Sequence, residues 1–69
     1  MIYAIPSRNS GWNGVEDERP YLIAGKRYPV LKDDGILFET KPDHGNPTIS
    51  CLWTGCAHID GGDWTRVDD

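Results

Sequence analysis

Short runs of alternating apolar and polar residues predict β-strands, because successive side chains of a strand point to opposite faces of a sheet. The pattern is clearest in residues 27–32 and 36–41, which flank the turn sequence DDG at 33–35. We expect these residues to form a β-hairpin in which Gly35 adopts a positive φ. Pro29 cannot donate a ladder hydrogen bond, so its strand is expected to lie at a sheet edge or to turn its N–H side outward.

Three further segments read as short strands, at residues 1–5, 48–53 and 64–67. A long polar stretch from Pro6 to Pro20 is rich in turn-forming residues and predicts a loop. The segment TGCAHIDGGD, which follows residue 53, is expected to form a tight connection with one helical turn. No segment has a sustained helical period, so a mainly β fold is expected.

Five strands with a long first loop and a short helical turn before the last strand resemble the small five-stranded SH3-like (Src-homology-3-like) barrel. The chain has 69 residues, enough for one domain over residues 1–69. Closing the sheet into a barrel would leave few open edges, which suits a chain too short for two layers. The composition, 38% hydrophobic and 10% aromatic, is that of a folding sequence.

Two stretches carry a closer resemblance, AGKRYPVLKDDGILF and GDWTRV, which together cover 21 of the 69 residues. They are similar to a set of small phage and prophage proteins with SH3-like folds: a Gly-Lys pair, an aromatic residue, a strand, an acidic-Gly turn, a second strand and a closing strand. The resemblance implies a fold and a phage origin. Because the function of those proteins is mostly unknown, it supplies no catalytic or binding residue.

Charge narrows the range of partners. The net charge is −4, and the basic residues are spread along the chain rather than clustered. Binding to a nucleic-acid backbone needs clustered Lys and Arg, so we do not expect it. The weak alternative is that the chain binds nucleic acid through Arg8, Arg19, Lys26 and Arg27. No secretory signal and no apolar stretch of about 20 residues is present, so we expect a cytoplasmic protein with no membrane partner.

The segment from residue 50 to residue 64 offers the strongest candidates for chemistry. Cys51, Cys56 and His58, with His44 as a fourth ligand, could hold a zinc ion tetrahedrally. Against this, Cys51 alternates with Ile49 and Trp53 and reads as a core cysteine. We favour free thiols, with a Cys51–Cys56 disulfide and the zinc site as alternatives, and we expect no cofactor.

The sequence of this segment supports catalysis and calcium binding less than it supports free thiols or a zinc site. Cys56 and His58 could form a nucleophile and base, but the pattern matches no known nucleophile motif. Asp60 and Asp63 lack the ligand order of a calcium loop and read as a solvated turn. We therefore do not expect an enzyme.

The remaining hypothesis is a protein-interaction module. By analogy with SH3-like barrels, the long loop, the second hairpin loop and the helical turn would wall a groove. The aromatic residues expected near it are Trp12, Tyr21, Trp53 and Trp64. The alternative is that these rings belong to the core, and for Trp53 and Phe38 we favour that alternative. Aromatic side chains are enriched in interface hot spots and line grooves that bind proline-rich peptides. The partner is expected to be a protein or a second copy of the chain.

Overall fold

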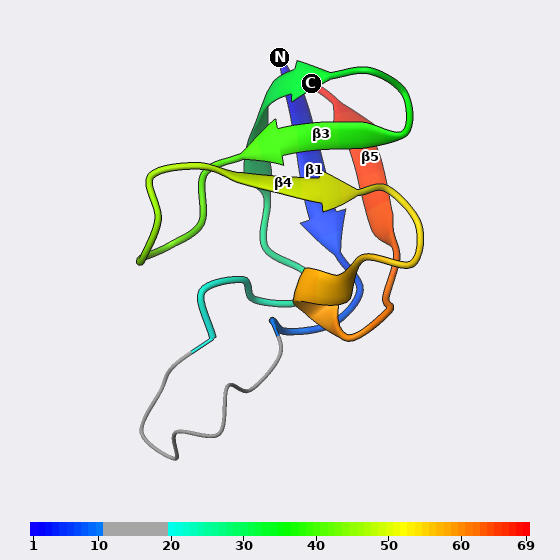
Figure 1. The fold of residues 1–69 in the computed structure, drawn as a ribbon. Coiled ribbons are helices and arrows are strands. Elements are labelled where there is room, and N and C mark those ends of the chain that lie inside the picture. The colour runs from blue at the N-terminus through cyan, green and yellow to red at the C-terminus, as the bar shows by residue number, and fades with distance from the viewer. Residues whose placement is uncertain (11–19) are drawn as a thin grey trace.

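A computed structural model describes residues 1–10 and 20–69 of the chain. It is mainly β, with five antiparallel strands in one curled, half-barrel sheet of order β4-β3-β2-β1-β5 (Figure 1). The elements are β1 Ile2–Pro6, β2 Tyr28–Asp33, β3 Leu37–Thr40, β4 Ile49–Leu52, the short 3-10 helix η1 Ala57–Ile59 and β5 Trp64–Asp68. The predicted five strands and the helical turn before the last of them are confirmed.

Strand β2 links the two parts of the sheet. Its residues Tyr28 and Pro29 pair with β1, whereas from Val30 onward it pairs with β3. A register shift between Val30 and Lys32 marks the change, and irregularities of this kind bend a strand. Strand β2 is therefore not an edge strand, which contradicts the first of the two alternatives expected from Pro29. The ladder between β1 and β2 spans only two residue pairs, so the N–H that Pro29 lacks has little pairing to disrupt.

The hairpin between β2 and β3 is closed by its aspartates. Gly35 has the predicted positive φ, at 95°. Asp33 Oδ1 accepts the Gly35 N–H at 2.8 Å, and Asp34 Oδ1 accepts the N–H groups of Ile36 and Leu37 at 2.9 and 2.7 Å. Side-chain acceptors of this kind replace backbone partners in turns. Ile36, predicted as a strand residue, lies in the turn for this reason.

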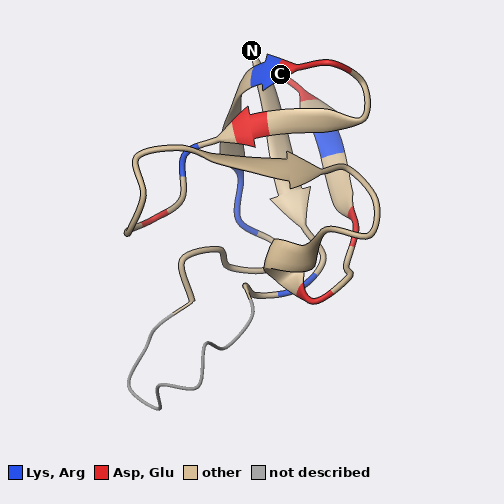
Figure 2. Ribbon diagram, viewed as in Figure 1, with Lys and Arg blue, Asp and Glu red and all other residues tan. Residues whose placement is uncertain are grey.

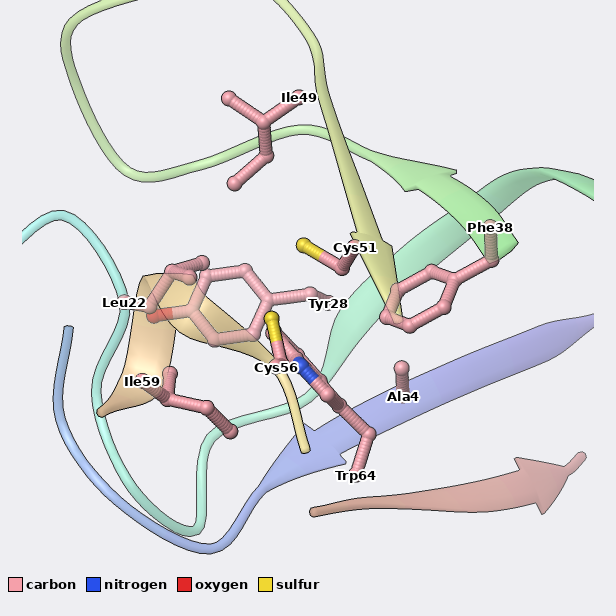
Figure 3. Packing of buried hydrophobic residues seen from close by; sticks show 9 residues of the cluster. All are labelled: Ala4, Leu22, Tyr28, Phe38, Ile49, Cys51, Cys56, Ile59 and Trp64. Carbon is pink, nitrogen blue, oxygen red and sulfur yellow. The ribbon is translucent and has the colours of Figure 1, made fainter. Parts of the chain in front are cut away.

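The hydrophobic core fills the concave side of the sheet (Figure 3). It contains nine buried residues: Ala4, Leu22, Tyr28, Phe38, Ile49, Cys51, Cys56, Ile59 and Trp64. The ring of Phe38 packs against two indoles, with its centroid 4.1 Å from that of Trp53 and 5.0 Å from that of Trp64. Aromatic pairs in such geometry add stability beyond the area that they bury. The alternation in β4 correctly predicted that Cys51 faces inward together with Ile49.

Strand β1 and its neighbour, the edge strand β5, bring residues 1 and 69 together. Strand β1 pairs with β5 along its whole length, from Ile2 opposite Asp68 to Pro6 opposite Trp64. The amino group of Met1 donates to the carbonyl of Asp69 at 2.7 Å, and Asp69 N–H donates back to the Met1 carbonyl at 2.9 Å. Among the described residues, no helical segment has the length or apolar character that crossing a membrane requires.

Candidate functional site

A shallow hollow of about 260 Å³ lies where three segments distant in sequence meet. We call it the Tyr21 groove. Tyr21 comes from the long first connection, His44 from the loop between β3 and β4, and His58 from η1. The full lining is Tyr21, Pro42, His44, Gly45, Asn46, Ile49 and His58.

The ring of Tyr21 stands edge-on to both histidines. Its centroid lies 6.5 Å from that of His44 and 6.0 Å from that of His58, with interplanar angles of 82° and 85°. The Tyr21 hydroxyl and His58 Nδ1 are 3.0 Å apart, and His58 Nε2 lies 3.0 Å from the carbonyl oxygen of Ser50. A carbonyl only accepts, so Nε2 carries the proton, and in the neutral ring Nδ1 accepts from the tyrosine. His58 is thus held at both nitrogens.

Backbone hydrogen bonds fix Tyr21 from both sides. Its N–H donates to Ser10 Oγ at 2.9 Å, and its carbonyl accepts the Asp43 N–H at 2.9 Å. Ser10 is buried and also accepts the N–H of Leu22 at 3.3 Å. These contacts tie the end of the first connection to the loop between β3 and β4.

Asp43 anchors the loop that carries His44. Its carboxylate accepts the Tyr28 hydroxyl at 2.8 Å and pairs with the ammonium group of Lys26. The hydrogen bond from Lys26, and then that from Tyr28, hold the pKa of Asp43 below its usual range. Burial, with a further contribution from Asp43, raises the pKa of Tyr28 to about 12 although the Ile23 N–H opposes this shift. Tyr28 therefore keeps its proton and donates to Asp43 across the physiological pH range.

The four predicted aromatic residues do not share one surface. Tyr21 lies in the groove and is half-buried, but Trp64 is only 6% exposed and belongs to the core. Its prediction as a surface residue is wrong because the first residue of β5 faces inward, against Tyr28 and Phe38. Trp12 lies outside the described residues.

Trp53 takes part in a different cluster. Its ring stacks on Phe38, and its Nε1–H donates to Asp33 Oδ1 at 3.0 Å. Arg66 lies over the ring at 5.8 Å and binds Asp33 Oδ2 at 2.5 Å. These contacts hold Trp53 between the core and the β2–β3 hairpin, where it has a structural role.

The stability of the protein is expected to fall in acid because of Asp33. Hydrogen bonds from Trp53 and then from the Gly35 N–H, together with the Arg66 charge, lower the pKa of this carboxyl. Asp34 and Asp43 are shifted in the same direction. A lowered folded-state pKa means that the unfolded chain binds more protons, so this stabilisation is complete above about pH 4 and is lost as the pH falls further.

Urea unfolding followed by tryptophan fluorescence at a series of pH values measures this dependence. Asp33→Asn removes one titrating group, so its stability should fall less steeply with decreasing pH than that of the parent. An identical slope for the two proteins below pH 4 would contradict the assignment to Asp33.

The candidate zinc ligands do not converge. Cys51 and Cys56 are buried in the core, whereas His44 and His58 line the groove and both ring nitrogens of His58 are engaged. Within residues 1–10 and 20–69, no group of three or more His, Cys, Asp or Glu side chains is placed to hold a metal ion. The same hydrogen bonds separate the His58 ring from the thiol of Cys56, so the proposed nucleophile and base do not form a pair.

Charged residues are dispersed along the described part of the chain (Figure 2). Arg8 lies 3.8 Å from Asp60, Lys26 binds Asp43, and Arg27 binds Asp69 at 2.6 Å. Three of the four basic residues considered for nucleic-acid binding are thus paired with aspartates, and the fourth, Arg19, lies outside the described residues.

A second, larger hollow of about 460 Å³ lies beside β3. Exposed Leu37 and Leu52 lie opposite each other on β3 and β4, near it. Its lining is Lys32, Asp33, Asp34, Leu37, Phe38, Glu39 and Ser50. Four of these seven side chains are charged and one is an aromatic ring, whereas three aromatic rings line the Tyr21 groove.

No protein-family model matches this chain, and no curated protein or solved structure matches it. The resemblance to phage and prophage SH3-like proteins, and the cytoplasmic location, stay predictions.

Sequence reasoning found Tyr21 but assigned the two histidines of the groove to another chemistry. His44 and His58 were considered as zinc ligands, and Pro42 and Asn46 were not predicted as site residues. The signal that could have found them is the loop between the third and fourth strands, since that loop was already expected to wall the groove. Which of its side chains face Tyr21 depends on the Asp43–Tyr21 backbone contact, which has no signature in the sequence.

Proposed function

We propose that this chain is a small, non-enzymatic binding module with an SH3-like fold, and that its Tyr21 groove holds an extended, proline-rich segment of a partner protein. The observation that carries the proposal is the convergence of three ring side chains, Tyr21, His44 and His58, from three separate segments on one open hollow.

The arrangement of the strands supports the SH3-like part of the proposal. The sheet order β4-β3-β2-β1-β5 puts the last strand beside the first, and β2 pairs with both β1 and β3. The long first connection and the 3-10 turn before β5 complete the expected pattern. These two segments are also the ones that supply Tyr21 and His58 to the groove.

The shape of the groove supports an extended peptide as its occupant. Its volume of about 260 Å³ is below the ~300–1,000 Å³ of pockets that enclose small molecules. The edge-on packing of Tyr21 against two imidazoles leaves ring faces and edges side by side, with Pro42 and Ile49 adding apolar surface. A polyproline II helix fits such surfaces because it is already extended and loses little conformational entropy on binding.

The proposal is tested by titrating the labelled protein with a panel of proline-rich peptides and following its backbone amide resonances. The resonances of Tyr21, His44 and His58 should shift, and a Gly/Ser-rich peptide of equal length should leave them unchanged. Tyr21→Ala should weaken binding roughly 10- to 30-fold, the cost typical of an interface hot spot. His44→Ala, at an exposed loop position, provides a second variant with little effect on folding.

The matched control is Tyr3→Ala, which removes a half-buried tyrosine from β1, outside the groove. Equal binding by the parent and the Tyr21→Ala protein, with an unchanged fold, would refute the groove as the binding site. Shifts confined to Leu37 and Leu52 that grow with protein concentration alone would instead identify self-association through the outer face of β3 and β4.

A further inference from the structure

Two cysteine side chains that the groove does not use face each other in the core. Cys51 lies on the buried face of β4 and Cys56 directly precedes η1; both are free thiols and each is only 1% exposed. Their sulfur atoms lie on the same side of the core, between β4 and Trp64 (Figure 3). The thiol of Cys51 donates a hydrogen bond to the sulfur of Cys56.

The sulfur of Cys56 is surrounded by donors. Besides the Cys51 thiol, it faces the indole N–H of Trp64 and the backbone N–H groups of His58 and Leu52. Trp64 Nε1 is buried and has no other hydrogen-bond acceptor within the described residues, which leaves the sulfur as the group that it faces. Such a ring of donors stabilises a thiolate.

These contacts shift the pKa values of the two thiols in opposite directions. The hydrogen bond from Cys51, followed by those from Trp64 and the backbone, lowers the pKa of Cys56 to about 5 despite its burial. The same hydrogen bond, with burial, raises the pKa of Cys51. A thiolate next to a protonated thiol is the arrangement of an attacking and a resolving cysteine.

We propose that Cys51 and Cys56 are a redox-active pair that a peroxide converts into a reversible disulfide. The thiolate of Cys56 attacks one oxygen of hydrogen peroxide, the O–O bond breaks, and hydroxide leaves as Cys56 becomes a sulfenic acid. The sulfur of Cys51 then attacks the Cys56 sulfur, an S–S bond forms, and the sulfenic oxygen leaves as water with the Cys51 proton. In total, two cysteines lose two electrons, and one peroxide is reduced to one water and one hydroxide, which takes a proton from solvent to become the second water.

The surroundings of the two cysteines favour formation of the Cys51–Cys56 disulfide and favour hydrogen peroxide as the oxidant. Hydrogen-bonded sulfurs need to approach by only roughly 1–2 Å to reach the S–S bond length of about 2.05 Å. Only four residues separate the two cysteines, and Gly55 closes that turn with a positive φ of 65°. Because each cysteine is 1% exposed, a bulky disulfide reagent cannot reach the pair while the chain is folded, so the oxidant assigned to it is one scarcely larger than water.

The test treats the folded, reduced protein with increasing hydrogen peroxide and then measures its mass after denaturation and alkylation. The intact mass should fall by about 2 Da and both alkylation sites should be lost together. Met1, the single, exposed methionine, provides an internal measure of dose because its sulfoxide adds about 16 Da. Dithiothreitol added after denaturation should restore both thiols, and oxidised glutathione should react with the folded protein far more slowly than peroxide.

Three results would overturn the proposal. The first is two alkylatable thiols at a peroxide dose that fully oxidises Met1. The second is the gain of oxygen atoms on a cysteine without the 2 Da loss, and the third is a disulfide between two chains. The variant Cys51→Ser, which keeps a hydrogen-bond donor beside Cys56 but no second thiol, adds a test of the order of events: a sulfenic acid should accumulate on Cys56. Cys56→Ala should leave Cys51 unmodified.

Discussion

Replacing Phe38 with alanine is expected to lower the free energy of unfolding by about 3–5 kcal/mol, the usual cost of removing a buried phenylalanine ring. Phe38 is 2% exposed and packs against both Trp53 and Trp64. The substitution removes the ring that packs against both indoles and leaves a cavity beside them. A domain of this size has a total stability of only roughly 3–10 kcal/mol, so most molecules of the variant should be unfolded or close to unfolding.

The control is the neighbouring residue on the opposite face. Leu37 is 42% exposed, so Leu37→Ala should cost less than about 1 kcal/mol. Urea unfolding followed by the fluorescence of the tryptophans measures both variants. Equal losses for Phe38→Ala and Leu37→Ala would mean that the two faces of β3 are not divided into core and surface as described.

The second large effect on stability is expected from removal of the Tyr28 hydroxyl group. Tyr28→Phe keeps the buried ring but removes a hydroxyl that accepts the Ile23 N–H at 2.7 Å and donates to Asp43 at 2.8 Å. One partly buried N–H then lacks its acceptor, and a carboxylate loses one of its donors. Leaving such groups unpaired costs about 1–3 kcal/mol. The loop that carries His44 should also loosen, since Asp43 holds it.

Tyr3→Phe is the matched control, because the Tyr3 hydroxyl donates only an exposed hydrogen bond to the Met1 sulfur. Its stability should stay within about 0.5 kcal/mol of the parent. Thermal unfolding by circular dichroism gives the stability, and amide exchange of residues 43–46 reports on the loop. A Tyr28→Phe protein as stable as Tyr3→Phe would show that the hydroxyl does not anchor the loop.

Much of the fold could be predicted because its local signals agree with one another. The alternation around Phe38 and Cys51 set the inward faces of β3 and β4, and the DDG sequence set the hairpin. Pro29 suggested an edge strand, but β2 lies inside the sheet. A proline is tolerated there because the ladder between β1 and β2 is short, and its length depends on where β2 changes from pairing with β1 to pairing with β3. Such a change is a property of the whole sheet, not of a local stretch.

The site was harder to predict than the fold for a related reason. Tyr21, His44 and His58 come from segments that no local pattern connects, and the contacts that bring them together run through Ser10 and Asp43. Cys51 and Cys56 were correctly favoured as core thiols, since the alternation of β4 points Cys51 inward. Their mutual contact could not be predicted, because it depends on how the turn at Gly55 folds back.

The pairing of β1 with β5 determines how the molecule would respond to a pulling force. Residues 1 and 69 hydrogen bond to each other at one end of an antiparallel ladder. Tension applied between these two residues would load the ladder at that end alone, so its pairs would separate one after another instead of sharing the load. Resistance to stretching in this direction is therefore expected to be low, and the direction of pull, more than thermodynamic stability, would decide how readily the protein extends.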